Sequence, residues 1–316
     1  MEFRKLISFG KTSYVVSIPK TWVKRNNLKK GDTVGLVENE GNLLLTPGNA
    51  EDLQKPRSIE FDITGIDRTS ILYVIRSAYK IGYDEIKLRF KTPQAIYYRF
   101  DRKEKVISVI HEEVNRLVGI EVVQQKEDFC IIKDISDPSP REFDNILRKV
   151  FLILNDASND LIESIEKNDT ILLETIEEKH NSVTKFISYC LRLLNKRNKG
   201  GKDMLLYHIL SNLDKIMDAL KYSARDIRNI NTALKKETIR ILRQIAFSIT
   251  KYHELFYKFD FSKVSKLYEN RDNVIRDIIR LSKKHPRREL LILEKAAAIL
   301  ELITDLTEAK MGLENY

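Results

Sequence analysis

The stretch KTSYVVSIPKTWVKRNNLKKGD, residues 11–32, decides how the N-terminal part of the chain folds. It begins with an alternating apolar run, reaches a proline, continues through a short amphipathic segment with the only Trp, and ends on Gly-Asp. The β-branched and aromatic residues before Pro19 favour a strand, and residues 20–28 fit a short helix. The final KKGD is typical of a turn.

Positive charge is concentrated in the same region. The first 30 residues carry eight Lys and Arg side chains against Glu2 alone, a net +7 of the chain's +9. A run of cations is often only a solvated surface. Here the cations stand at strand ends and on a short helix, where a rigid frame can hold them against phosphates. The pattern therefore favours an acidic partner such as a nucleic acid.

The flanking segments complete a small unit. Residues 4–9 read as another strand, and residues 33–47 as a hairpin with its bend at 39–41. Short strands and a two-turn helix in a segment of about fifty residues cannot close a core alone, so a second copy must cover the strand edges. A two-fold symmetric homodimer, or a higher even oligomer, is the simplest expectation.

Residues 2 to about 47 resemble the AbrB/SpoVT swapped-hairpin domain. The resemblance rests on Ile18-Pro19-Lys20, the short helix, Leu28 with Gly31-Asp32, and ENEGNLLLTP at 38–47. It implies a dimeric β-barrel of interleaved hairpins that binds double-stranded DNA through its first loop and helix. KTSY lengthens the first hairpin relative to shorter bacterial members. The matching basic positions are Arg4, Lys5, Lys11, Lys20, Lys24 and Arg25.

We assign residues 1–50 to this domain and residues 51–141 to a small α/β layer with a spacer or sensor role. Neither GxGxxG nor GxxxxGK[ST] follows any predicted strand. IYYRF at 96–100 suits base stacking or packing against a neighbouring element, and both remain open. The layer's strands are predicted at 57–64, 84–90, 120–125 and 128–135, and its helices at 67–82 and 102–119.

The chain after residue 141 is predicted to be all helical. SDPSPREF at 136–143 breaks any preceding element, and apolar residues then recur at intervals of three and four. NKGGK at 198–202 marks a turn. The pattern indicates two three-helix units, at about 142–229 and 230–316, within a multidomain α+β chain.

An internal repeat supports this division. LDKIMD at 213–218 matches LELITD at 300–305, and residues 178–183 align with 269–274. Residues 144–316 resemble the PhoU family, whose two triple-helix repeats carry an E/D-x-x-x-D motif. The resemblance implies a role in phosphate-uptake control and metal clusters at the motif. The matching positions are Asp214, Asp218, Glu301 and Asp305.

Carboxylates at i and i+4 share one helix face and can share a hard cation. Oxygen ligands suit Mg²⁺, Ca²⁺ or Mn²⁺, and Zn²⁺ or iron fits if His180 approaches. The alternative is an ordinary solvated acid pair. On the middle helices, positions where many family members carry acids hold His180 and Thr184, then Arg271 and Ile275.

Catalysis has little support. Glu177 and His180 form a single E-x-x-H, whereas di-iron bundles need two. Cys130 and Cys190 lie far apart without a CxxC, so we expect buried thiols. With no membrane-spanning run or signal segment, a cytoplasmic location and no membrane insertion are expected.

The leading hypothesis is a homodimeric DNA-binding transcription regulator whose helical half senses or relays phosphate status, an arrangement that resembles archaeal phosphate uptake regulators. A second hypothesis is a PhoU-like accessory protein that modulates a phosphate transporter or signalling kinase by protein contacts. The third is an antitoxin-type AbrB regulator. The long ordered-looking C-terminal part argues against the third, because antitoxins append short disordered tails.

Overall fold

The structure is a computed structural model, and it describes residues 2–39, 42–48, 56–136, 141–196, 201–230 and 233–314. The chain divides into two compact units, one ending at Pro56 and the other beginning at Arg57. The α/β layer and the helices both belong to the second unit. Four predicted features fall wholly or partly outside the described residues: the domain boundary at 50/51, hairpin bend residues 40–41, boundary residues 137–140 and turn residues 198–200.

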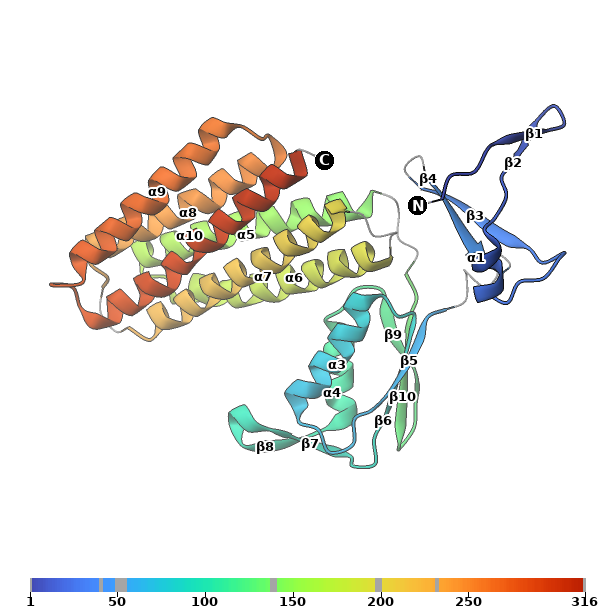
Figure 1. Cartoon of the computed structure of the whole chain (residues 1–316). Coiled ribbons are helices and arrows are strands. Elements are labelled where there is room, and N and C mark those ends of the chain that lie inside the picture. Colours follow the sequence, from blue (N-terminus) through green and yellow to red (C-terminus); the bar gives the residue numbers. More distant parts are fainter. Residues whose placement is uncertain are drawn as a thin grey trace. The chain divides into compact units, whose positions relative to one another are not determined.

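The first unit contains the predicted strands and short helix (Figure 1). Its described strands form two separate antiparallel pairs, so one chain does not close a barrel in the part that the structure describes. The elements are β1 (Ile7–Phe9) paired with β2 (Ser13–Val15), α1 (Lys20–Arg25), and β3 (Val34–Asn39) paired with β4 (Asn42–Pro47).

The turn between α1 and β3 is fixed by its Gly-Asp pair. Gly31 has φ +97°, in the left-handed region that favours glycine. The Asp32 carboxylate accepts a hydrogen bond from the Lys29 backbone N–H at 2.6 Å. Gly31 and Asp32 therefore stabilise the predicted turn, Gly31 through its backbone conformation and Asp32 through its side-chain hydrogen bond.

The second unit begins with a four-stranded sheet in the order β5-β6-β10-β9, in which β5 and β6 are parallel and the other pairs antiparallel. Helices α3 and α4 cover one face of this sheet (Figure 1). The bounds are β5 (Ser58–Asp62), α3 (Arg68–Ile81), β6 (Glu85–Arg89), α4 (Val106–Asn115), β9 (Ile120–Gln125) and β10 (Phe129–Asp134).

Helix α3 is well delimited by its ends. The Asp67 carboxylate accepts from the backbone N–H of Thr69 at 2.9 Å and of Ser70 at 3.3 Å, which caps the first turn. Gly82 ends the helix in a left-handed conformation with φ +97°. Its apolar face buries Ile75 and Tyr79 completely.

The prediction of a helix over 102–119 was wrong at its start. A hairpin precedes α4, made of β7 (Gln94–Tyr97), the 3₁₀ turn η1 (Tyr98–Phe100) and β8 (Arg102–Lys105). The Val106 N–H donates to the Pro93 carbonyl at 3.0 Å, and the helix begins only there. Tyr97 packs edge-on against Phe100, whereas Tyr98 is 73% exposed. Packing therefore accounts for part of IYYRF but not for all of it.

The described helices after residue 141 follow the predicted periodicity (Figure 1). In contact are α5 with α6, α6 with α7, α7 with α10, and α8 and α9 with α10. Their bounds are α5 (Glu142–Lys167), α6 (Thr170–Lys196), α7 (Gly201–Arg228), α8 (Lys236–Tyr257), α9 (Phe261–Leu281) and α10 (Arg287–Glu314).

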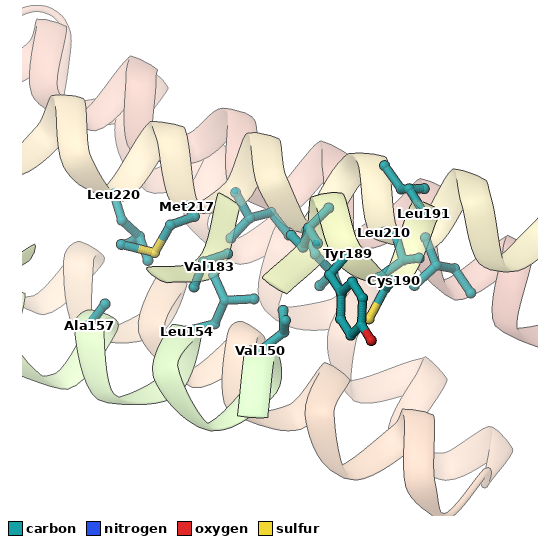
Figure 2. Close-up of a cluster of buried hydrophobic side chains, with 14 of the residues drawn as sticks. Val150, Leu154, Ala157, Val183, Tyr189, Cys190, Leu191, Leu210, Met217 and Leu220 are labelled. Atoms are coloured by element: carbon teal, nitrogen blue, oxygen red, sulfur yellow. The ribbon is translucent and has the colours of Figure 1, made fainter. Parts of the chain in front are cut away.

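The core of the first helical repeat lies where α5, α6 and α7 meet. Figure 2 shows Leu154 of α5, Val183 of α6 and Met217 of α7 within one cluster of buried side chains. Each is 1% exposed or less. Burial of this kind contributes about 1.5–3 kcal/mol per large apolar side chain, so the periodic apolar stripe determines the bundle.

Helix α3 packs against α6, which joins the α/β layer to the helices. Arg192 of α6 is 1% exposed and donates to the Tyr79 carbonyl at 2.8 Å and to Asp134 at 2.6 Å. Lys196 also donates to Asp134, at 2.6 Å. Burial by itself raises the pKa of Asp134, but these hydrogen bonds outweigh that effect and hold the pKa well below its usual range.

Candidate nucleic-acid interface and repeated acidic motifs

All six basic residues proposed for DNA binding are exposed. Arg4 pairs with Glu2 at 2.5 Å. Among the described residues, the other five, Lys5, Lys11, Lys20, Lys24 and Arg25, have no ion-pair partner. They are therefore available for phosphate groups. That all six lie on one face of a dimer stays a prediction.

Lys24 and Arg25 stand on the last turn of α1. Cations there also stabilise the helix through its dipole, by about 0.3–1 kcal/mol each. The helix has six residues. At its C-terminal end, the Asn26 side-chain amide donates a hydrogen bond to the Trp22 carbonyl at 2.9 Å. A short rigid frame thus carries both side chains into solvent.

The first unit buries no described residue completely. Phe9 is 72% and Leu43 62% exposed, and even Trp22 is only half-buried. Leu43 and Leu44 are consecutive residues of β4, so they point to opposite faces of the hairpin, and both are exposed. Apolar surface on both faces of a hairpin requires a partner.

The acids of the first repeat have partners within the chain. Asp218 accepts from His180 Nε2 at 2.9 Å and from Lys221 Nζ at 2.5 Å, and these bonds lower the pKa of Asp218 to about 2. Asp214 accepts from the Thr184 hydroxyl at 2.9 Å. The structure therefore brings His180 and Thr184 to the motif, with a lysine beside them.

The acids of the second repeat lie in a different environment. Glu301 is exposed and receives a bidentate pair from Arg271, with distances of 3.0 and 2.8 Å. Asp305 is exposed and has no ion-pair partner in the part of the chain that the structure describes. The two motifs match in sequence, but only the first is enclosed by other side chains.

A divalent metal does not fit the motifs as they are arranged. Across the described ranges, no three His, Cys, Asp or Glu side chains gather at metal-binding distances. Lys221 Nζ lies 3.0 Å from His180 Nε2 and 2.5 Å from Asp218 Oδ1, so an ammonium group stands beside both candidate ligands and its charge opposes a cation there. His180 Nδ1 is buried without a partner among the described residues, but one orphan nitrogen does not make a ligand set.

The side chains of the E-x-x-H pair, Glu177 and His180, do not point to a common site. Glu177 receives a bidentate pair from Arg225, at 2.9 and 2.7 Å, whereas His180 bonds to Asp218. The two side chains therefore serve separate ion pairs.

The sequence analysis missed the cations that face the first motif. Lys221 follows Asp218 by three residues, a spacing that places both on one helix face, so it could have been found. Lys80 of α3 is far from the motif in sequence. Burial lowers the pKa of Lys80, and the charge of Asp214 counteracts that shift. For Arg76 of α3, burial lowers the pKa, but the bidentate pair with Glu113 raises it above its usual value and Asp214 adds a smaller contribution.

In the described residues, no helix is long and apolar enough to cross a membrane.

Comparison with known proteins gives two separate findings. Residues 8–52 match the family model described as antidote-toxin recognition MazE, bacterial antitoxin. No curated protein matches the chain.

The helical part has PhoU structures among its neighbours. PhoU from Pseudomonas aeruginosa is 15% identical with a TM-score of 0.43, and 54% of this chain covers 93% of it. The phosphate transport system regulatory protein PhoU from Streptococcus pneumoniae is 14% identical with a TM-score of 0.45, and 55% of this chain covers 94% of it. A putative PhoU-like phosphate regulatory protein from Shewanella oneidensis MR-1 is 11% identical with a TM-score of 0.35, at 54% and 98% coverage. The MazE match overlaps the segment for which a resemblance to the AbrB/SpoVT domain was expected.

Proposed function

We propose that the chain is a homodimeric DNA-binding transcription regulator linked to phosphate uptake or signalling, with the helical half as sensor or relay. The observation that carries the DNA-binding part is the set of exposed cations, five of them without an ion-pair partner among the described residues, on a unit in which no described residue is fully buried. Two copies that bury the apolar hairpin faces form one body with a doubled set of cations. Phosphate contacts of this kind supply affinity without a base code.

The link to phosphate rests on the sequence resemblance of residues 144–316 to the PhoU family. No catalytic step is part of the proposal. The signal passes through protein contacts of the helical half, because the ammonium group of Lys221 lies against both His180 and Asp218 and its charge opposes a cation there.

Duplex binding by the full chain tests the DNA-binding part. Changing Lys24→Ala and Arg25→Ala together removes up to four phosphate contacts per dimer, so affinity for a 30-base-pair duplex at low salt falls by at least about tenfold. The matched control is Lys283→Ala with Lys284→Ala, two adjacent exposed lysines of the helical half. Equal binding by wild type and both variants contradicts the proposal.

Recovery of the DNA bound in phosphate-rich and phosphate-poor cells tests the phosphate link separately. The proposal predicts that occupancy of the bound sites changes with phosphate supply. If the same sites are occupied to the same extent in both conditions, the phosphate link is wrong, whereas the DNA-binding part of the proposal still stands.

A second function, antitoxin, is favoured by the match of residues 8–52 to the MazE model. The two functions differ in what loss of the protein does. Loss of an antitoxin releases its toxin and arrests growth, whereas loss of a phosphate regulator changes gene expression with phosphate supply. Growth and transcript levels after depletion of the protein distinguish them.

A further inference from the structure

The two helical repeats present equivalent faces, and only one is covered. Because residues 178–183 align with 269–274, and 213–218 with 300–305, α6 corresponds to α9 and α7 to α10. Helix α3 of the α/β layer packs on α6. No described element packs in the same way on α9.

The covered face holds an amphipathic helix by a combination of apolar packing and charge. Ile75 and Tyr79 of α3 are fully buried. Arg192 and Asn195 of α6 donate to the Tyr79 and Lys80 carbonyls of α3, at 2.8 Å each. Burial lowers the pKa of Lys80, and the charge of Asp214 on α7 partly offsets that shift. The face of α6 and α7 therefore holds α3 by apolar packing, by hydrogen bonds to its last carbonyls and by an acidic charge.

The equivalent face of the second repeat is open and apolar at its floor. A shallow groove of about 320 Å³ lies between α9 and α10. Ile279 is 64% exposed in this groove. In α6, by contrast, most side chains of the corresponding C-terminal half are buried. The lining includes Ile275, Ile278 and Ile279 from α9 and Glu294, Ala297 and Ala298 from α10.

The α10 side of this groove is acidic, with Glu294 and Glu301 in its lining. Glu294, Asp305 and Glu308 are exposed on α10, and in the described ranges none of them has an ion-pair partner. They are spaced by eleven and three residues, which places them along one stripe of the helix. Glu301, the counterpart of Asp214, lies on the same stripe and lines the groove.

We propose that the groove between α9 and α10 binds a basic amphipathic helix of a partner protein, as the face of α6 and α7 holds α3. Apolar side chains of the partner cover Ile275, Ile278 and Ile279, and its Lys or Arg residues meet the free carboxylates of α10. This inference does not depend on what the N-terminal unit binds.

A second copy of the chain is a poorer occupant. Its own α3 is already buried, with Ile75 and Tyr79 at 0% exposure, so that helix is not free to dock elsewhere. Helix α1 is basic but has only six residues, against fourteen in α3.

The test uses the helix that packs on the corresponding face of the first repeat. A fluorescein-labelled peptide of residues 66–83, which is α3 with its caps, is titrated with the full-length protein and followed by anisotropy. We expect saturable binding, and binding at least about tenfold weaker to the variant Ile279→Lys. A peptide with Arg76→Glu and Lys80→Glu should bind weakly to the wild type. The matched control is Ile171→Lys, at an apolar residue of α6 that is 75% exposed.

Absence of saturable binding overturns the proposal, as does equal binding to wild type and to Ile279→Lys. Circular dichroism confirms that the variants fold. If Ile279→Lys lowers the mass of the unliganded protein in sedimentation, the groove is an interface between copies of this chain, and the partner-helix proposal is wrong.

Discussion

Asp218 shows how one carboxylate of the repeated motif is stabilised. Hydrogen bonds from His180 and Lys221 lower its pKa to about 2. Because the folded pKa lies below the value of about 3.9 for an unfolded Asp, the stabilisation is complete above about pH 4 and is lost as the pH falls toward 2.

Replacement of Asp218→Asn should therefore lower the free energy of unfolding at pH 5 but matter less at pH 2.5. Because 42% of the Asp218 side chain is exposed, screening limits the effect to about 1 kcal/mol. Urea unfolding at both pH values measures it. Asp305→Asn, at the equivalent exposed position, is the control and should change stability by less than about 0.5 kcal/mol. Equal effects at both pH values contradict this account of Asp218.

Arg192 makes a much more strongly buried ion pair. At 1% exposure it bonds to Asp134, whose side chain is 7% exposed, and to the Tyr79 carbonyl. Arg192→Met leaves a buried carboxylate with Lys196 as its one remaining basic partner among the described residues, so we expect a loss of about 3–5 kcal/mol in urea unfolding. Arg280→Met, at a side chain 78% exposed, should cost less than about 0.5 kcal/mol. A comparable loss for both variants would mean that burial of the pair is not the cause.

At the scale of residues, sequence spacing predicted part of the site. The i, i+4 rule places Asp214 and Asp218 on one helix face, and the structure gives them neighbouring partners on α6. Sequence could not show that α3 brings Arg76 and Lys80 within the electrostatic influence of Asp214, because these residues are more than 130 positions apart.

At the scale of elements, the hairpin β3–β4 is the clearest sign of a missing partner. Leu43→Asp with Leu44→Asp places a charge on each face of β4 and should convert the dimer to a monomer, since both faces need apolar cover. Sedimentation of the full chain measures the mass. Ile171→Asp, at an exposed residue of α6, is the control and should stay dimeric. A wild-type monomer, or a dimer unaffected by the double change, contradicts the interleaved arrangement.

Periodicity predicted long elements better than short ones. Each described helix from α5 to α10 has an apolar stripe that repeats over several turns, so chance matches are few. The hairpin β7–β8 was missed because Arg102–Lys105 carry no apolar alternation and run directly into the pattern of α4. Four charged residues before an amphipathic run read equally well as the first turn of a helix.

At the scale of the whole molecule, the chain combines a coreless basic unit with a larger unit that carries its own core. Eight of the first thirty residues are cations, and those proposed for DNA binding remain exposed. In the proposed dimer, each chain neutralises three or four phosphates, and this number determines how steeply duplex binding depends on salt.

The salt dependence of duplex binding by the full chain therefore tests the central claim most directly. A plot of log K against log salt should have a slope of roughly −5 to −7, at about −0.9 per phosphate contact. Lys24→Ala with Arg25→Ala should make the slope shallower by roughly 3 to 4, and Lys283→Ala with Lys284→Ala should leave it unchanged. A wild-type slope near zero, or one that the first pair of changes does not alter, contradicts the proposal that these residues form the DNA interface.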